Sequence, residues 1–319
     1  MKKYYAGLDL GGTFVKGGIV DEQGRIVIKD KIPTGRERPY GAIAADMAQL
    51  VKDLASRAGL QEGQVAGVGI GSPGLIDAEH GVIVYSNNIR WENVPLCGAV
   101  QERLGLPVCI TNDANAAALG EHFCGAGKQF GSMVFITLGT GVGGGVILNG
   151  ELFEGFRSAG GEIGHMVIER GGWSCTCGRK GCFEAYASAT GLIRRTRESM
   201  EAHKESAMWK IAGSLENVDG KTAFDGMRAG DAAAKQVVDE YISYLAEGVI
   251  NLVNIFRPEA IVLGGGVCAE GETLLAPLRE KVSPWLFGGA DYAPVAIVAA
   301  SLGNDAGLCG AARLAMCRK

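Results

Sequence analysis

The chain has 319 residues, a formal net charge of −4 and a hydrophobic fraction of 47%. This length can hold two lobes with a core each, and the charge argues against a nucleic-acid-binding protein, which normally carries a basic face. No apolar run approaches the ~20 residues that cross a bilayer, so we expect neither nucleic acid nor a membrane as partner. The N-terminal segment MKKYYAGLDLGGT lacks the apolar stretch of a signal peptide, which predicts a cytoplasmic location.

The first part of the chain alternates strand-like and helix-like segments. YYAGLDL and FVKGGIV, joined by GGT, predict a β-hairpin with a glycine turn at its mouth. VAGVGIGSPG and PVCITND are expected as strands, and ANAAALGEHFCG as a helix. Residues 41–58 predict a further helix, because their apolar side chains recur on one face. That face consists of Ile43, Met47, Leu50, Val51 and Leu54.

The second half begins with another strand and glycine turn, SMVFITLGTGVGGGVILNGEL. Shifted by 128 positions, it matches the first hairpin: Leu10, Gly11, Gly17 and Ile19 fall on Leu138, Gly139, Gly145 and Ile147. Chance similarity between two glycine-rich hairpins is one explanation. An internal duplication is the other, and it predicts two lobes of similar topology that face each other across a cleft.

A long helix is predicted over residues 231–256, before Pro258. EAIVLGGGV follows as a strand and GLCGAARLAMCRK as a helix. The alternation of strands and helices along the chain indicates the α/β class. The apolar face of the long helix consists of Val238, Tyr241, Ile242, Leu245, Val249 and Val253.

Three strands run into glycine turns: DLGGT, TLGTGVGGG and LGGGV. Nucleotide phosphates need backbone N–H donors at close range, which side chains would obstruct. None of the turns has P-loop spacing. Gly139, Gly141 and Gly144 fit the dinucleotide pattern, but a strand-like segment follows them where that pattern requires a helix. A single glycine turn is usually structural, whereas three at strand ends favour a nucleotide site.

Asp9 stands in the first glycine turn. It is either a hydrogen-bonded turn residue or the group that holds the Mg²⁺ of MgATP, through water, since Mg²⁺ keeps much of its hydration shell. Thr13 and Lys16 are candidates for contacts with phosphate oxygens, and Lys16 fits an exposed strand position equally well.

The segment from His165 to Cys182 has the spacing H-x9-C-x-C-x4-C through Cys175 and Cys177. One imidazole and three thiolates suit a tetrahedral structural zinc, with no position left open for catalysis. A disulfide would leave one cysteine over. Six further cysteines are expected to be small buried hydrophobic residues, which fits a reducing compartment: Cys97, Cys109, Cys124, Cys268, Cys309 and Cys317.

Two acids flank this metal segment, Glu162 and Glu184. On a loop that a metal holds rigid, carboxylates can bind sugar hydroxyls, although each could also be an unpartnered surface acid. A metal bound through one nitrogen of His165 leaves the other nitrogen to donate to a hydroxyl.

These motifs together resemble the ROK family (repressors, open reading frames and kinases) of the actin-like ATPases. The resemblance covers nearly the whole chain, from DLGGT through TNDANAAALGE, GEIGH and CTCGRKGCFE to IVLGGGV. The metal segment is its specific part. ROK repressors carry a helix-turn-helix ahead of the first glycine turn, and Asp9 leaves no room for one, so a kinase is expected rather than a repressor.

The resemblance implies roles for individual residues. Asp113 corresponds to the catalytic aspartate that faces the attacking sugar hydroxyl. Sugar contacts are implied at Asn87 or Asn88, Asn112, Asp113, Glu162, His165 and Glu184. The ATP turns are implied at Gly11, Gly12, Thr13, Thr140, Gly141, Gly143, Gly144, Gly264, Gly265 and Gly266.

It also implies a two-lobed actin-like ATPase fold of the ribonuclease H-like type. The expected lobes are residues 1–112, joined by a helix at about 305–319, and residues 113–304 with the metal loop. Homodimers or higher homo-oligomers are expected by analogy.

The expected reaction is in-line attack of a sugar hydroxyl on the γ-phosphoryl group of MgATP. The segments CTCGRKGCFEAYASATGL and TGVGGGVILNGELFEG look most like those of bacterial glucokinases, so the 6-hydroxyl of glucose is the expected acceptor. N-acetylmannosamine, fructose, mannose or allose stay open as acceptors, and polyphosphate as donor. A non-catalytic sugar sensor would need neither Asp113 nor the ATP turns. Zinc removal is expected to weaken sugar binding, with little direct effect on ATP.

Overall fold

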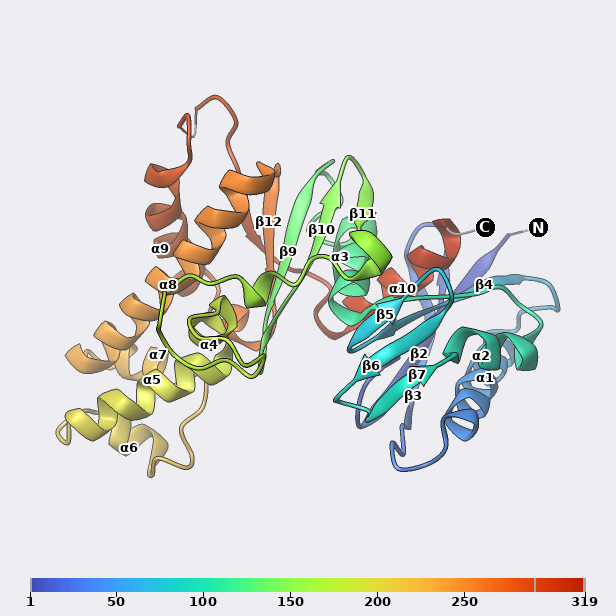
Figure 1. Cartoon of the computed structure of the whole chain (residues 1–319), viewed down its shortest axis with the longest axis horizontal. Coiled ribbons are helices and arrows are strands. Elements are labelled where there is room, and N and C mark those ends of the chain that lie inside the picture. Colours follow the sequence, from blue (N-terminus) through green and yellow to red (C-terminus); the bar gives the residue numbers. More distant parts are fainter. Residues whose placement is uncertain (1, 290, 318–319) are drawn as a thin grey trace. The chain divides into compact units, whose positions relative to one another are not determined.

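A computed structural model describes residues 2–289 and 291–317 (Figure 1). The chain divides into two compact units, which are described separately below. The first unit comprises Met1–Phe135, Gly145–Gly161 and Ala300–Lys319, and the second comprises Ile136–Gly144 and Glu162–Ala299. Within the described residues, no helix has both the length and the apolar character of a membrane span.

The first unit contains a five-stranded sheet in the order β3-β2-β1-β4-β8. β1 and β2 form the predicted antiparallel hairpin, and β3 extends it. β4 runs parallel to β1, and β8 runs parallel to β4. The strand bounds are β1 Tyr4–Leu10, β2 Phe14–Asp21, β3 Ile26–Pro33, β4 Val65–Ser72 and β8 Val108–Asn112.

Two helices cover one side of this unit's core, α1 (Tyr40–Arg57) and α2 (Leu96–Leu104). All five apolar residues predicted for the face of α1 are buried there. They join one hydrophobic cluster with side chains from β1, β2 and β4. The helical periodicity of residues 41–58 therefore identified a real core face.

Glycines bring α3 (Asp113–Cys124) and α10 (Ala306–Cys317) into direct backbone contact. A Cβ on Gly310 would overlap the carbonyl oxygen of Ala116, and one on Gly120 would overlap that of Ala306. Gly7 and Gly69 allow the backbone of α10 to pack directly against β1 and β4 in the same way. These four glycines lie outside the three predicted glycine turns and serve the packing of helices instead.

A three-stranded sheet of β5 (Leu75–Asp77), β6 (Val82–Ser86) and β7 (Trp91–Val94) also belongs to the first unit. The sequence analysis did not predict it, because strands of three to five residues carry too little alternation to be recognised. Asn87 and Asn88 lie in the turn between β6 and β7.

A second five-stranded sheet has the order β11-β10-β9-β12-β13. In chain order, both sheets follow the same arrangement: third, second, first, fourth and fifth strand. An internal duplication predicts this agreement. The division between the two units passes through β9 and β10. The bounds are β9 Met133–Leu138, β10 Val142–Leu148, β11 Glu151–Phe153, β12 Ala260–Gly264 and β13 Ala296–Ala299.

The second unit is rich in helices, of which α8 (Ala232–Phe256) is the longest. Asp231 caps its start by accepting a hydrogen bond from the N–H of Ala234, and Arg257 ends it in a left-handed conformation before Pro258. The six residues predicted for its apolar face are all buried. The other helices are α4 Phe183–Ala187, α5 Ala189–Ala202, α6 Met208–Ala212, α7 Thr222–Arg228 and α9 Glu272–Val282.

The division into compact units differs from the lobe boundary expected after residue 112. Residues 113–135 and 145–161 fall in the first unit, because α3 packs against α10. A boundary after residue 112 would separate α3 from that partner. Where the functional lobes divide therefore stays a prediction.

Short 3-10 helices complete the structure. They are η1 Phe156–Ser158, η2 Ile163–His165, η3 Gly266–Glu270, η4 Ser283–Trp285 and η5 Gly303–Asp305.

Candidate active site and metal centre

Three parallel strands of the first unit place predicted site residues at one edge of the sheet. Asp9 on β1 is level with Gly71 on β4, and Gly71 is level with Thr111 on β8. Asn112 ends β8, and Asp113 begins the helix that follows. Ligands of open α/β sheets bind beyond the carboxyl ends of the strands. The sheet therefore brings Asp9 and the Asn112–Asp113 pair to the edge where a ligand is expected.

Asp113 is an exposed residue in the first turn of α3, and its neighbours fix its position. The Asn112 side chain accepts a hydrogen bond from the N–H of Ala114 at 2.8 Å and donates to the carbonyl of Gly74 at 3.2 Å. Asp113 Oδ1 accepts a further bond from Ala114 N–H at 2.9 Å. Asn112 is thus the helix cap, which leaves Asp113 as the first helical carboxylate.

The first glycine turn is fastened by a residue that the sequence analysis missed. Thr34 is fully buried; its hydroxyl donates to the carbonyl of Gly11 at 2.6 Å, and its N–H donates to the carbonyl of Thr13 at 2.9 Å. Thr34 belongs to no motif, so only the folded chain reveals this role. A Cβ on Gly12 would come within 3.1 Å of the carbonyl oxygen of Asn88, so the predicted nucleotide turn packs on the turn after β6.

Asp9 and Lys16 face each other across the hairpin. Lys16 Nζ lies 2.9 Å from Asp9 Oδ2, and both side chains are partly exposed. The ion pair gives both charged side chains a partner when no ligand is bound. It also holds a carboxylate and an ammonium group beside the glycine turn, where a Mg²⁺–phosphate group would need them.

The second and third glycine turns lie together in the second unit. Gly265 has a φ of 91°, and a Cβ there would overlap the backbone of Leu138 at the end of β9. Helix α5 holds the second turn: Ala189 N–H donates to the carbonyl of Gly139 at 2.8 Å, and the Thr190 hydroxyl donates to the carbonyl of Thr140 at 2.7 Å. Two of the three predicted phosphate turns are therefore neighbours.

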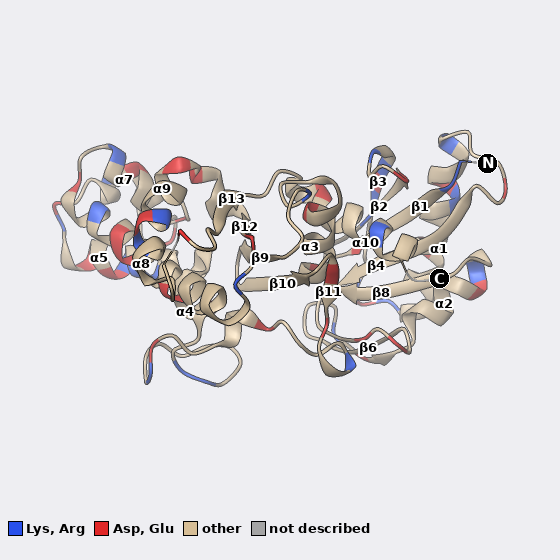
Figure 2. Ribbon diagram, turned by 90° about the horizontal axis from the view of Figure 1, so that it is seen from above, with Lys and Arg blue, Asp and Glu red and all other residues tan. Residues whose placement is uncertain are grey.

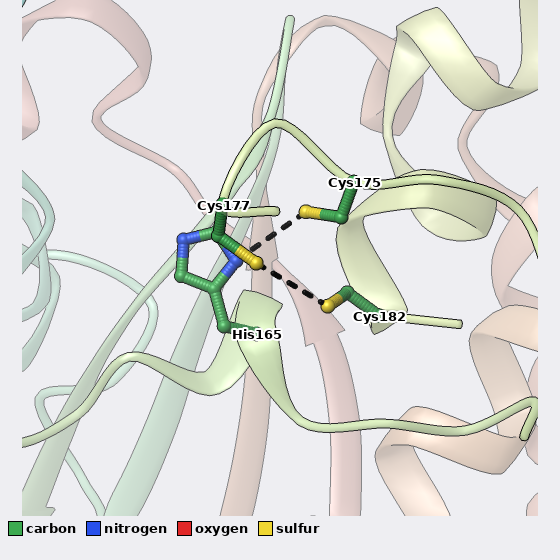
Figure 3. Close-up of side chains that lie close together, drawn as sticks. All are labelled: His165, Cys175, Cys177 and Cys182. Atoms are coloured by element: carbon green, nitrogen blue, oxygen red, sulfur yellow. Dashed lines mark hydrogen bonds between the residues drawn. The ribbon is translucent and has the colours of Figure 1, made fainter. Parts of the chain in front are cut away.

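The four predicted metal ligands converge (Figure 3), with their candidate ligand atoms all within 4.8 Å of one another. Cys177 Sγ lies 3.7 Å from Cys182 Sγ, and Cys175 Sγ lies 3.6 Å from His165 Nδ1. Tetrahedral zinc with bonds of about 2.3 Å to sulfur and about 2.0 Å to nitrogen sets these spacings at about 3.8 and about 3.5 Å. The donor set and its spacing fit zinc.

Glycine turns explain how a short segment brings the sulfurs together. Gly178 and Gly181 have φ values of 88° and 82°, which other residues rarely adopt. Between them the chain reverses: Cys175 N–H donates to the carbonyl of Arg179 at 2.9 Å. His165 enters from η2 with Nδ1 toward the sulfurs, which leaves Nε2 on the opposite side of the ring (Figure 3).

The cluster perturbs its own thiols. Burial, together with the neighbouring Cys177 and Cys175 thiols, raises the pKa of Cys182 to about 12. The backbone N–H of Arg179, with help from the other two thiols, lowers the pKa of Cys177 below its ordinary value. Since zinc binds thiolates, metal binding must release the proton of Cys182.

The two flanking acids differ in their surroundings. Glu184 is half-buried; its Oε2 accepts a hydrogen bond from the N–H of Val142 at 3.0 Å, and its Oε1 accepts one from the Thr176 hydroxyl at 3.3 Å. Glu162 is exposed, and its backbone carbonyl accepts from the N–H of His165 at 3.1 Å. Glu184 is therefore tied to the second glycine turn, a contact that the sequence analysis did not anticipate.

An aromatic stack anchors the metal segment to the helices. Trp173 stacks on Tyr186 with ring centroids 4.8 Å apart, and Tyr186 stacks on Tyr244 at 4.4 Å. Arg194 lies 4.0 Å above the Trp173 ring, and Arg195 contacts both Trp173 and Tyr244. The sequence analysis missed this stack, because its members are scattered along the chain with no recognisable spacing.

The remaining cysteines follow the prediction only in part. Cys97 and Cys309 are buried, whereas Cys109, Cys124 and Cys268 are half-buried. Cys317 is exposed, so its prediction as a buried residue is wrong. It occupies the final turn of α10, beyond the part of the helix that faces the core.

Charged side chains of the second unit are mixed in sign. Figure 2 shows Lys and Arg close to Asp and Glu on its helices. Arg194 pairs with Glu198 within α5, and Arg228 on α7 pairs with Glu270. These two cations are thus balanced locally.

Comparison with known proteins agrees with this fold. The sequence profile of the ROK family matches residues 5–318. The glucokinase of Thermotoga maritima is 41% identical over 310 residues, which cover 97% of this chain and 96% of that protein. A ROK family glucokinase from Streptomyces griseus, solved in complex with glucose and AMPPNP, has a TM-score of 0.80 at 37% identity and covers 98% of this chain and 99% of its own.

The ROK hexokinase of Thermus thermophilus has a TM-score of 0.83 at 36% identity, with 98% of both chains covered. These structures and the two sheets define the fold class, a two-lobed α/β fold of the actin-like ATPase type. The chain belongs to the ROK family.

Proposed function

We propose that this protein is an ATP-dependent glucokinase that transfers the γ-phosphoryl group of MgATP to the 6-hydroxyl of glucose. The observation that carries the proposal is the position of Asp113. Its exposed carboxylate lies at the carboxyl edge of the sheet, and β1 of the same sheet leads into the first glycine turn at this edge. The glucokinases with which the chain shares nearly its full length support glucose as the acceptor. The reducing cytoplasm, which keeps metal-binding thiols reduced, is the proposed compartment.

Asp113 has an orienting role in this mechanism. Phosphoryl transfer proceeds through a loose transition state, so the protein mainly positions the reactants and stabilises charge. An ordinary aspartate has a pKa of about 3.9, far below that of an alcohol. Asp113 therefore accepts a hydrogen bond from the acceptor hydroxyl, aligns its oxygen with the phosphorus, and takes the proton late in the reaction.

The glycine turns bind the nucleotide. Backbone N–H groups at Gly11–Thr13, Thr140–Gly144 and Gly264–Gly266 donate to phosphate oxygens, and Lys16 adds a positive charge. Asp9 holds the hydrated Mg²⁺ of MgATP. When bound, that ion neutralises charge on the phosphates.

The sugar site is built around the metal segment. His165 Nδ1 and the three thiolates hold a structural zinc, so that His165 Nε2, Glu162 and Glu184 are fixed for the sugar hydroxyls. Asn112 and the turn that contains Asn87 and Asn88 complete the proposed contacts. Zinc supplies rigidity here and takes no part in phosphoryl transfer.

A coupled ADP-release assay with glucose, mannose, fructose, allose and N-acetylmannosamine tests this function, with ATP and polyphosphate as alternative donors. We expect the highest kcat/KM for glucose with ATP, and a product that glucose 6-phosphate dehydrogenase oxidises. Sugar binding without turnover of any sugar would identify a non-catalytic sensor instead. A homo-oligomer is the proposed assembly, and light scattering of the purified protein measures it.

A further inference from the structure

The backbone of Val142, in the second glycine turn, is contacted from two sides by the metal segment. The N–H of Val142 donates to Glu184 Oε2 at 3.0 Å. Its carbonyl oxygen packs against Gly164, where a Cβ would overlap it. Gly164 immediately precedes the metal ligand His165, and Glu184 follows the ligand Cys182 by two residues. The proposed phosphate-binding turn therefore rests on residues whose positions depend on the metal centre.

The Glu184 carboxylate joins these two parts of the unit directly. Its Oε1 accepts a hydrogen bond from the hydroxyl of Thr176, which lies between the ligands Cys175 and Cys177, and a second from the Cys175 thiol at 3.7 Å. A zinc-bound Cys175 is a thiolate and cannot donate, so in the loaded protein Thr176 is the donor from this loop. A Cβ on Gly141 would overlap Oε2, so the carboxylate lies against the backbone of the turn itself. One side chain thus connects the Cys-x-Cys loop to the backbone of Gly141 and Val142.

We propose that Glu184 is a positioning residue for the nucleotide site, through which occupancy of the metal centre sets nucleotide affinity in the absence of sugar. The inference rests on the proposed function, in which residues Thr140–Gly144 hold ATP phosphates. It replaces the expectation from the sequence that zinc removal has little direct effect on ATP, because the contact of Glu184 with Val142 was not visible in the sequence. The acceptor on Val142 N–H fixes the orientation of that peptide and of the donors beside it. Without metal the Cys-x-Cys loop gains freedom, so the carboxylate is anchored to a more mobile segment, and nucleotide binding must supply the ordering of the turn.

A second set of contacts holds the same turn without involving the metal segment. The hydroxyl of Thr190 donates to the carbonyl of Thr140, and Ala189 N–H donates to that of Gly139. Both donors belong to α5. A variant at Thr190 therefore weakens the turn from the other side and serves as a matched control.

The test measures the dissociation constant of MgADP by calorimetry, without sugar, for zinc-loaded and chelator-treated full-length protein. We expect chelation to raise the Kd of the natural protein about tenfold, a usual size for coupling between sites. Glu184→Ala is expected to have the raised Kd in both metal states. Thr190→Val is expected to raise the Kd while keeping the ratio between the two states.

Loaded protein alone provides a second measurement should chelation unfold the chain. Thr176→Val removes the loop anchor of Glu184 and leaves all four ligands in place. We expect a Kd for MgADP raised about threefold, at the lower end of such couplings, with unchanged zinc content. Glu184→Gln keeps an acceptor oxygen for Val142 N–H and is expected to bind MgADP better than Glu184→Ala.

The outcomes separate the two proposals. Loaded protein that binds no MgADP would overturn the proposed nucleotide site, and the coupling with it. A second outcome would overturn the coupling alone. In that outcome the loaded natural protein binds MgADP normally, and the Kd values of the chelated protein, of Glu184→Ala and of Thr176→Val all lie within twofold of its Kd. Metal dependence that persists unchanged in Glu184→Ala would show that the path does not run through this carboxylate.

Discussion

The position of Asp113 follows from that of its neighbour Asn112. Asn112 takes the capping position that an aspartate after a strand often occupies, and it also ties the end of β8 to Gly74. Asp113 is thereby available in the first turn for a substrate hydroxyl. The residue types alone could not show which of the two caps the helix, since both types cap helices well.

Replacing Asp113 by Asn tests its role with almost no change in shape. We expect glucose binding to persist and kcat to fall by about 10²- to 10⁴-fold, the usual contribution of a positioned proton acceptor. Steady-state kinetics and glucose calorimetry measure the two quantities. Asp225→Asn, in the first turn of α7, is the matched control and should keep normal kcat. Near-normal turnover of Asp113→Asn would refute the assignment.

Buried polar residues to which the sequence assigned no role show where sequence reasoning stops. Glu121 is fully buried and accepts hydrogen bonds from the N–H groups of Ala126, Ser301 and Leu302. It connects α3 to the segment before α10, some 180 positions away. Like Thr34, it has partners that only the folded chain brings near. By contrast, His165 and the three cysteines of the cluster lie within one short segment, so their spacing sufficed to predict that they converge.

At the scale of elements, long periodic segments were predictable and short ones were not. The faces of α1 and α8 follow from a repeat sustained over many residues. The β5–β7 sheet and the turn with Asn87 and Asn88 have no such repeat. The contact of Glu184 with Val142 is long-range and depends on how α4 meets β10, which no local pattern encodes.

The backbone contact of α3 with α10 predicts a large difference between two glycine substitutions. Gly310→Ala forces a methyl group into the carbonyl of Ala116, and overpacking of this kind costs about 1–3 kcal/mol or more. Gly98→Ala in α2 meets nothing within 4 Å and should stabilise by up to about 1 kcal/mol. Urea unfolding measures both changes. Equal changes in the free energy of unfolding for the two variants would mean that α3 and α10 can move apart without loss of stability.

Asp231 makes the stability of the second unit depend on pH. Burial opposes ionisation, but hydrogen bonds from the N–H groups of Ala234 and Ala207 outweigh it and hold the pKa below its ordinary value of 3.8. A depressed carboxyl pKa stabilises the fold above the unfolded pKa, and this contribution is lost as pH falls through the folded pKa.

We therefore expect Asp231→Ala to lower the free energy of unfolding by about 1–2 kcal/mol at pH 7. The difference from the natural protein should shrink as the pH is lowered past the folded pKa. Urea unfolding at a series of pH values measures it. Asp231→Asn retains one acceptor and has no charge to lose, so the difference in the free energy of unfolding between Asp231→Asn and Asp231→Ala should not change with pH. A difference that stays constant with pH would contradict the role of the ionised cap.

At the scale of the whole molecule, two sheets of one topology support different chemistry. The first unit presents Asp113 at the ends of parallel strands, and the second carries the metal segment beside two glycine turns. The repeated strand order agrees with the sequence match between the two hairpins. The functional difference lies in what each unit adds to its sheet.

Metal removal tests the contribution of the Cys₃His cluster. We expect elemental analysis to find one zinc per chain, and a strong chelator to weaken glucose binding at least tenfold, as perturbing a metal site commonly does. Circular dichroism should show that the overall fold persists, because the aromatic stack on Trp173 still anchors the segment. Protein purified without chelators that contains no zinc would contradict the assignment.

The position of α10 has a consequence for biosynthesis. This helix packs on β1, β4 and α3 and closes the core of the first unit, yet it follows the entire second unit along the chain. Domains generally fold as they leave the ribosome, beginning with the N-terminal one. Here the segment that is synthesised first cannot complete its core until α10 has been made. The second unit is therefore free to fold earlier. Nascent chains that stall before α10 should expose the apolar face of β1 and β4 to chaperones.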